Sequence, residues 1–169
     1  MYVGLSKYPP QVAQLAYKYL AENNVRCLLY QGKYNILNQE PETSGVLEQA
    51  KKNGTGFIAF SPLAQGLLSD KYIGGHISSD SRMAQNAFLK RDVLTPDLLD
   101  KITKLNEIAK RRGQTLAQMA LSWVLRKSAV SSVIIGASSN KQIDDNLMAL
   151  ENKVFAIDEL FKINEIVNE

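Results

Sequence analysis

The sequence predicts an α/β fold in which short parallel strands alternate with helices, and three observations support this. Four short apolar runs, rich in β-branched and aromatic residues, are spaced along the 169 residues. Helical periodicity separates them in the order β-α-β-α-β-loop-α-α-β-α-α, which is typical of a parallel sheet with crossover helices. A glycine or proline follows each run within a few residues. Four such strands fit either half of a (β/α)8 barrel or a small open sheet.

The first strand and helix occupy the start of the chain. Residues 1–5 form an apolar run that predicts a strand, which the Pro9-Pro10 pair ends. A helix follows. Its buried face is expected at four residues with i, i+3, i+4, i+7 spacing: Val12, Leu15, Ala16 and Tyr19.

Two further strands are predicted before the middle of the chain. One covers residues 25–31 and the other residues 56–61, where Pro62 ends it because proline cannot continue a central ladder. A polar loop over 32–42 and a short helix ended by Asn53-Gly54 lie between them. The buried residues of that helix are expected to be Val46, Leu47 and Ala50.

Helices dominate the second half. A long connection over 62–95 leads to a helix over 96–112, which Gly113 ends. Thr115 and Gln118 have capping-box spacing at the start of an apolar helix that contains Trp123. Asp158 is expected to cap a final helix. The buried rows are predicted at Leu98, Ile102, Leu105 and Ala109 in the first of these helices, and at Phe161, Ile163, Ile166 and Val167 in the last.

The stretch 133–146 is the strongest candidate for a ligand site. A β-branched strand runs into Gly136, whose backbone can turn and approach a ligand closely. Ser139 and Gln142 then have capping-box spacing, so Ser139 is the expected N-cap of a helix whose inner row is Ile143, Asn146, Leu147 and Leu150. The amino end of a helix suits a phosphate. A plain strand–turn–helix without a ligand is the alternative.

Composition sets the protein class. At 45% hydrophobic and 22% charged residues, the chain resembles a globular protein forming a single domain over residues 1–169. A net charge of +3, without basic runs interleaved with aromatics, argues against nucleic-acid binding. The single cysteine, Cys27, excludes an internal disulfide and is expected to be a small buried hydrophobe. With neither a membrane-length apolar run nor a signal-peptide layout, we expect a cytoplasmic protein without membrane contact.

Polar residues follow the ends of all four predicted strands, which is where parallel α/β sheets bind ligands. Amides, hydroxyls and a few cations make up this set, which suits an amide and phosphates and suits acid–base catalysis poorly. Ordinary turn and cap residues are the alternative. The only histidine, His76, falls in the long connection and is expected to be a solvated loop residue.

At this point the sequence resembles a known family. Residues 60–68, Phe-Ser-Pro-Leu-Ala-Gln-Gly-Leu-Leu, followed by Lys71-Tyr72, resemble the strand-7 segment of aldo-keto reductases, in the branch that contains potassium-channel β-subunits. Residues 132–138 with Gln142 and Asp145-Asn146 are similar to the strand-8 motif, and residues 116–123 to the helix before it. Residues 3–6 resemble strand 5, and Gln31 stands where strand 6 carries an amide. The resemblance implies the C-terminal half of a (β/α)8 TIM barrel that binds NADP(H).

The resemblance also implies a role for individual residues. Ser6 and Gln31 would hold the nicotinamide carboxamide, and Phe60 would take the place of the aromatic that stacks on the ring. The pyrophosphate would be surrounded by Ser61, Leu63, Gln65 and Lys71. The adenosine and its 2′-phosphate would be surrounded by Arg82, Gly136, Ser138, Gln142, Asp145 and Asn146. Lys7 and Gln142 depart from the asparagine and arginine that many members carry.

One absence limits this expectation. The family's catalytic Asp, Tyr, Lys and His lie on strands before the fifth, and this chain resembles only the fifth onward. It would therefore carry most of the cofactor site without a proton donor, and we expect it to be inactive alone. Self-association or a partner would supply the missing half-barrel and cover the open sheet edges. The alternatives are a non-enzymatic, cofactor-binding regulatory module and an unrelated phosphate-binding barrel.

Overall fold

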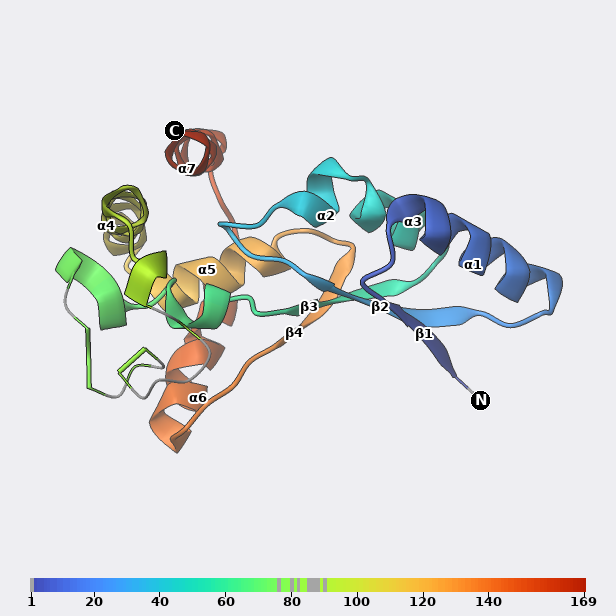
Figure 1. The fold of residues 1–169 in the computed structure, drawn as a ribbon, viewed down its shortest axis with the longest axis horizontal. Helices are drawn as coiled ribbons and strands as arrows, with labels where there is room; N and C mark the ends of the chain where they lie inside the picture. The colour runs from blue at the N-terminus through green and yellow to red at the C-terminus, as the bar shows by residue number, and fades with distance from the viewer. Residues whose placement is uncertain (1, 76, 80, 82, 85–88, 90) are drawn as a thin grey trace. The chain divides into compact units, whose positions relative to one another are not determined.

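A computed structural model describes residues 2–75, 77–79, 81, 83, 84, 89 and 91–169 (Figure 1). The chain divides into two compact units. Unit 1 comprises Met1–Pro62 and Val124–Ile135, and unit 2 comprises Leu63–Trp123 and Gly136–Glu169. The expectation of a single domain over 1–169 stays a prediction.

Unit 1 contains a parallel four-stranded sheet in the order β1-β2-β3-β4. The strands are β1 (Val3–Ser6), β2 (Cys27–Lys33), β3 (Gly56–Phe60) and β4 (Val130–Ile134). Each strand lies beside the one that precedes it in the sequence, as in a (β/α)8 barrel, whereas a doubly wound sheet reverses its order at a switch point. The predicted strands are therefore confirmed, although β2 begins and ends two residues later than expected and β4 begins three residues before the expected run at Val133.

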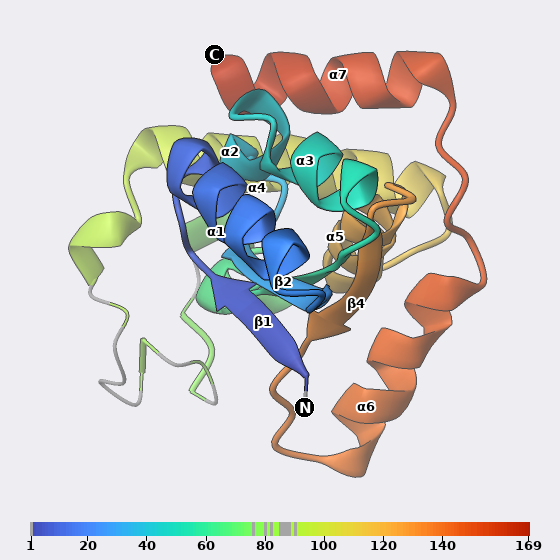
Figure 2. The same ribbon diagram turned by 90° about the vertical axis from the view of Figure 1, so that its right-hand side faces the viewer.

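Helices cover one face of this sheet. The helices of unit 1 are α1 (Pro10–Glu22), α2 (Glu40–Thr43) and α3 (Val46–Lys52), and Figure 2 shows α1 and α3 on the same side of the strands. Strand residues on the covered face alternate along the chain and are buried, as Tyr30, Phe57 and Ala59 show. The predicted burial of the α3 residues Val46, Leu47 and Ala50 is confirmed.

The expected buried face of α1 is wrong. Ala13 and Tyr17 are the buried residues of this helix, whereas Val12, Leu15 and Tyr19 are 45%, 68% and 66% exposed. The periodicity identifies an apolar row, but the neighbouring face of the helix, with Ala13 and Tyr17, is the one that packs in unit 1. The exposed row lies on the helix that directly follows β1, and β1 pairs only with β2 among the described strands. Unit 1 thus presents an open sheet edge and an apolar helix row together.

Unit 2 is built from helices and short 3₁₀ turns. The turns are Ala64–Gly66, Asp70–Gly75, Arg91–Val93 and Met148–Leu150, and the helices are α4 (Pro96–Arg111), α5 (Leu116–Leu125, whose last two residues belong to unit 1), α6 (Asn140–Leu147) and α7 (Ile157–Asn168). Of the predicted row of α4, Ile102, Leu105 and Ala109 are buried and Leu98 is half-buried, and Trp123 lies in the core as predicted. The capping box holds too, because Thr115 N donates to Gln118 Oε1 at 3.0 Å and Gln118 N to Thr115 Oγ1 at 3.2 Å.

Three expectations in unit 2 are wrong. Helix α6 has no buried residue, and Ile143, Leu147 and Leu150 are 44%, 54% and 49% exposed. Helix α7 begins after Ala156 rather than Asp158, because the Glu159 carboxylate accepts from Ala156 N at 2.8 Å. In α7, Ile163 and Ile166 are buried as predicted, but Phe161 is 63% exposed.

Within unit 2, Arg112 joins the end of α4 to the segment that leads into α7. The Arg112 side chain is only 3% exposed, and its guanidinium lies 3.7 Å from the centroid of the Phe155 ring. It donates to Gln114 Oε1 (2.8 Å), Glu159 Oε2 (2.7 Å), and the carbonyl oxygens of Asn152 (3.1 Å) and Val154 (3.0 Å). The planar fork of arginine makes such a multiple contact possible. Arg112 therefore fastens the segment before α7 to the end of α4.

Candidate functional site

The carboxyl ends of β1 and β2 bring Ser6 and Gln31 together. Ser6 is the last residue of β1 and is the register partner of Gln31 in β2. The ladder continues one step further, since Lys7 N donates to the Gln31 carbonyl oxygen at 3.0 Å. Register partners in parallel strands project from the same face of a sheet. The two polar side chains predicted for one amide group are thus neighbours at the strand ends.

Phe60 completes this cluster at the end of β3. Gln31 is in register with Ile58, and Phe60 follows two residues later, so it shares the face of Gln31, opposite to the face that the helices cover. The Lys7 ammonium lies 5.4 Å from the centroid of the Phe60 ring, within cation–π range. The structure therefore places an aromatic ring, an amide, a hydroxyl and a cation at one end of three adjacent strands.

The backbone at these strand ends is unusual. Lys7 and Ser61, which directly follow β1 and β3, have φ values of 58° and 52°, and Gln65 in the next turn has 62°. Residues with a Cβ adopt this left-handed region at a cost, and such positions gather at functional sites. The strain supports a binding role for the strand ends of unit 1.

A buried polar network supports the loop that follows β2. Tyr34 is fully buried, its hydroxyl donates to Glu42 Oε1, and it accepts from Arg126 Nη1 at 2.9 Å. Arg126 Nη2 also donates to Glu42 Oε1 at 2.8 Å, and the Lys127 ammonium contacts Glu42 Oε2. Burial raises the pKa of Tyr34 far above its ordinary value. Burial alone would also raise the pKa of Glu42, but hydrogen bonds from Lys127 and Tyr34 and the charge of Arg126 together lower it.

This network predicts a specific loss of stability in acid. Because the pKa of Glu42 is lowered by folding, its contribution is complete above the ordinary value of 4.5 and is lost as the pH falls through the lower folded value. We expect Glu42→Gln to cost about 2 kcal/mol at neutral pH and to flatten the fall in stability on acidification below about pH 5. Urea unfolding followed by circular dichroism measures both, with the exposed Glu48→Gln as control. Parallel acid profiles for Glu42→Gln and the parent chain would contradict the assignment.

The second cluster of predicted residues lies in unit 2, around the start of α6. Ser139 is its N-cap, accepting from Gln142 N at 3.3 Å, which confirms the cap. The Gln142 side chain turns back, and its Oε1 accepts from Ser138 N at 2.8 Å and from Ser138 Oγ at 3.2 Å. Asp145 and Asn146 follow Gln142 by three and four residues and so share its helix face. Gly136, Ser138 and Asp145 are exposed to solvent.

The remaining predicted residues fall in the connection after β3. Leu63 precedes the turn Ala64–Gly66, and its carbonyl oxygen accepts from Gly66 N at 2.8 Å and Leu68 N at 3.2 Å. Gln65 lies within that turn and Lys71 within Asp70–Gly75. Arg82 and His76 lie outside the described residues. The predicted roles of Leu63, Gln65, Lys71 and Arg82 in cofactor binding stay predictions.

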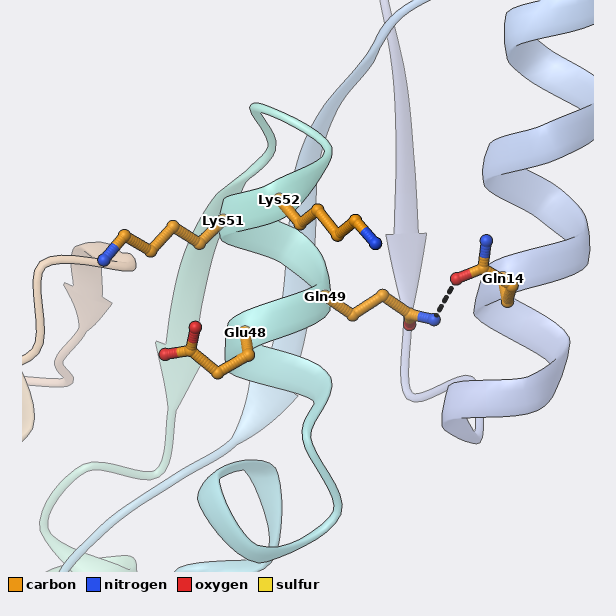
Figure 3. Close-up of a pocket in the computed structure, with 5 residues that line it drawn as sticks. All are labelled: Gln14, Glu48, Gln49, Lys51 and Lys52. Atoms are coloured by element: carbon orange, nitrogen blue, oxygen red, sulfur yellow. Dashed lines mark hydrogen bonds between the residues drawn. The ribbon is translucent and has the colours of Figure 1, made fainter.

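A separate hollow lies away from these clusters. It is an open polar groove on unit 1 between α1 and α3, where Gln49 Nε2 donates to Gln14 Oε1 at 2.8 Å (Figure 3). Its lining is Gln14, Glu48, Gln49, Lys51 and Lys52. The described residues contain no group of three His, Cys, Asp or Glu side chains that could hold a metal ion. No helix in the described part of the chain is long and apolar enough to cross a membrane.

The sequence does not predict the contacts that hold these loops in place. Asn35 donates through Nδ2 to the Ser61 carbonyl oxygen at 2.9 Å, across 26 residues of sequence. Arg126 reaches Tyr34 across 92 residues. Asn35 belongs to the polar residues expected just after the second strand, although its contact with Ser61 is not predicted. Nothing in the sequence near Arg126 signals its partners.

The comparisons with known proteins agree on one family. A model of the Aldo/keto reductase family matches residues 1–168. The L-glyceraldehyde 3-phosphate reductase of Escherichia coli strain K12 is 44% identical over 170 residues, which cover 98% of this chain and 49% of that protein. A probable voltage-gated potassium channel subunit beta of Arabidopsis thaliana is 37% identical over 126 residues, covering 73% of this chain and 38% of that protein.

A solved structure gives the same result. It is that of a thermostable aldo-keto reductase in complex with the inhibitor epalrestat, with a TM-score of 0.69 at 27% identity, and the match covers 98% of this chain and 48% of that one. The chain thus spans about half the length of the relatives it matches. Its four parallel strands, in sequential order and alternating with helices, are consistent with half of a TIM barrel. This chain belongs to the aldo/keto reductase family.

Proposed function

We propose that this chain forms most of the NADP(H) site of an oxidoreductase that reduces aldehydes or ketones. The observation that carries the proposal is the cluster at the strand ends of unit 1, where Ser6 and Gln31 are register neighbours and Phe60 shares their face. A nicotinamide needs an apolar ring to stack on and hydrogen-bonding partners for its carboxamide. The name of the Escherichia coli relative, which describes the reduction of an aldehyde, supports the carbonyl substrate.

The residues present fit the cofactor in parts. Ser6 and Gln31 offer both donors and acceptors, as a carboxamide requires. In unit 2, the amino end of α6 and the Ser138 hydroxyl suit a phosphate, although Gln142 Oε1 already accepts from Ser138 N. For a phosphate to accept from the backbone N–H of Ser138, the neutral Gln142 side chain would have to turn away from it. Lys71, with Arg82, would supply positive charge, and NADP(H) rather than NAD(H) is the expected cofactor.

The proton chemistry is assigned to residues outside this chain. The bound cofactor supplies a hydride, and the resulting alkoxide needs an acid. Tyr34 follows β2 but cannot serve, because it is buried, its hydroxyl donates to Glu42, and burial raises its pKa. The described residues that end β1, β2 and β3 include no aspartate, glutamate or histidine. Ser6, Gln31 and Phe60 would therefore orient the nicotinamide without moving a proton.

A complementary half-barrel would complete the site. Among the described strands β1 pairs with β2 alone, and α1, the helix that follows β1, exposes the row Val12, Leu15 and Tyr19. An unpaired strand edge and an exposed apolar row each indicate an interface. The occupant we assign is the other half of an aldo/keto reductase barrel, because the relatives are about twice as long as this chain. Such a half presents a strand for the edge and a helix for the row. A second copy of this chain is the competing outcome.

Cofactor binding is the direct test of the proposed function. We expect NADPH to bind the chain saturably in a calorimetric titration, and Phe60→Ala to weaken it about tenfold through lost ring stacking and burial. Adenosine 2′,5′-bisphosphate, which lacks the nicotinamide, should bind Phe60→Ala and the parent equally. Phe161→Ala, which removes a 63% exposed ring from α7, is the matched control. Absence of NADPH binding to the parent chain would reject the proposal.

A cofactor-binding regulatory module is the second candidate, favoured by the 37% identity to probable channel β subunits. If the chain is such a module, it should bind NADPH but reduce no carbonyl compound, even when the complementary half-barrel is present. Location in a reducing compartment such as the cytoplasm is expected for either function, since Cys27 is a free, buried thiol.

A further inference from the structure

The turn after β3 needs support from outside its own sequence. Ser61 has a φ of 52°, which few residues with a side chain adopt. It also precedes Pro62, and a residue before proline normally takes an extended backbone. Two local preferences therefore oppose the conformation that connects Phe60 to the following loop. Because Ser61 directly follows Phe60, the last residue of β3, a contact that holds Ser61 also fixes the position of the Phe60 ring.

Asn35 provides that support. Backbone pairing between β2 and β3 ends at Lys33 and Phe60, with a longer contact from Tyr34 N to the Phe60 carbonyl oxygen at 3.4 Å. One residue later the Asn35 side chain takes over, and its Nδ2 donates to the Ser61 carbonyl oxygen at 2.9 Å. The amide thus extends the ladder beyond the point where the backbone of Ser61 has turned away.

The Asn35 side chain is itself held in place. It is 1% exposed, and its backbone is closed into a turn by Asn35 N to Asn38 O at 3.2 Å and Asn38 N to Asn35 O at 3.0 Å. Its neighbours Tyr34 and Ile36 are fully buried. Its Oδ1 is buried and has no hydrogen-bond partner among the described residues. A buried amide that satisfies one end only is unusual, and in native proteins such a group calls for a specific explanation.

We propose that Asn35 is a positioning residue that sets the nicotinamide end of the cofactor site by holding the Ser61 carbonyl and, through it, the Phe60 ring. The inference rests on the proposed function, since it assumes that Phe60 receives the nicotinamide. Asn35 does not contact the cofactor in this account. Its loss lets the Ser61 turn relax, so that the ring is displaced from the ends of β1 and β2.

Comparing the affinities of two ligands distinguishes a role of Asn35 in positioning Phe60 from a role in stabilising the fold alone. NADPH uses both ends of the site, whereas adenosine 2′,5′-bisphosphate has only the adenosine end. We expect Asn35→Ala to raise the Kd of NADPH about tenfold and to leave that of adenosine 2′,5′-bisphosphate unchanged. Asn35→Ser, which keeps a shorter donor, should fall between Asn35→Ala and the parent. Asn38→Ala is the matched control, because only backbone atoms of Asn38 join the turn.

The result for each variant either supports the positioning role of Asn35 or excludes it. If the parent binds NADPH and Asn35→Ala binds it equally well, Asn35 has no positioning role and the proposed function stands. If Asn35→Ala weakens both ligands alike, its role is structural and the inference is overturned. If Asn35→Ala does not fold by circular dichroism, the same comparison is read from Asn35→Ser. If the parent binds neither ligand, the proposed function fails and the inference falls with it.

Discussion

Replacing Arg112 with alanine is expected to lower the free energy of unfolding of unit 2 by about 3 kcal/mol. The substitution removes four hydrogen bonds and a contact with the Phe155 ring. It also leaves Glu159 without its cation and the Val154 carbonyl oxygen without the Arg112 donor, while the Asn152 carbonyl oxygen still accepts from Gln114 Nε2 at 3.2 Å. Unpaired groups of this kind cost more than the net value of the bonds themselves.

The chain contains its own probe for this experiment. Trp123 is the only tryptophan and is fully buried in unit 2, so its fluorescence during urea unfolding reports on that unit. Arg111→Ala is the control, since Arg111 is the exposed neighbour of Arg112, and we expect a change within about 0.5 kcal/mol. Arg112→Lys should recover less than half of the loss, because an ammonium cannot reproduce the fork. Equal stabilities of Arg112→Ala and Arg111→Ala would contradict the assigned role.

Placing aspartate at Leu15 is expected to weaken assembly with the complementary half-barrel about 100-fold or more. Leu15 is 68% exposed at the centre of the apolar row of α1, so the chain alone should fold as before. In the assembled barrel the carboxylate would be buried without a partner. The effect should therefore be seen in association and not in the stability of the isolated chain.

The measurement uses a defined partner. We call the complementary fragment the part of the Escherichia coli L-glyceraldehyde 3-phosphate reductase that this chain does not match. Sedimentation of mixtures gives the association constant. Lys18→Asp on α1 is the control, because Lys18 lies outside the row and forms an exposed ion pair with Glu22. Equal association by Leu15→Asp and Lys18→Asp would show that the row is not the interface. Dimers of the chain alone that Leu15→Asp abolishes would identify a second copy as the occupant.

Local patterns predicted most of the fold because they depend on neighbours in sequence. The helix 46–52 and the capping box at Thr115 were found in this way. The sequence predicts too early an end for β2 because glycine and lysine, here Gly32 and Lys33, are typical of loops. Gly32 is instead required in the strand, since a Cβ there would lie 2.7 Å from the Phe57 ring. The rows on α1 and α6 were located correctly but assigned to the wrong side, because periodicity does not identify a partner.

In the candidate site, too, the residues set by local position are predictable and the long-range contacts are not. Ser6, Gln31 and Phe60 were expected at strand ends because strand position fixes which side chains meet there, and the register places them together. Asn35, Arg126 and Arg112 act through contacts that join residues 26, 92 and 47 positions apart. No local pattern announces such pairs, and the turning back of Gln142 onto Ser138 depends on loop geometry that only the structure shows.

The central claim is that this chain holds the cofactor while the proton-transferring groups lie in the other half of the barrel. The most direct test is NADPH oxidation with an aldehyde substrate, measured for this chain, for the complementary fragment, and for their mixture. We expect NADPH binding by this chain, background oxidation by either part alone, and aldehyde-dependent oxidation by the mixture. Aldehyde reduction by this chain alone, or a mixture that associates and binds NADPH but reduces no aldehyde, would contradict it.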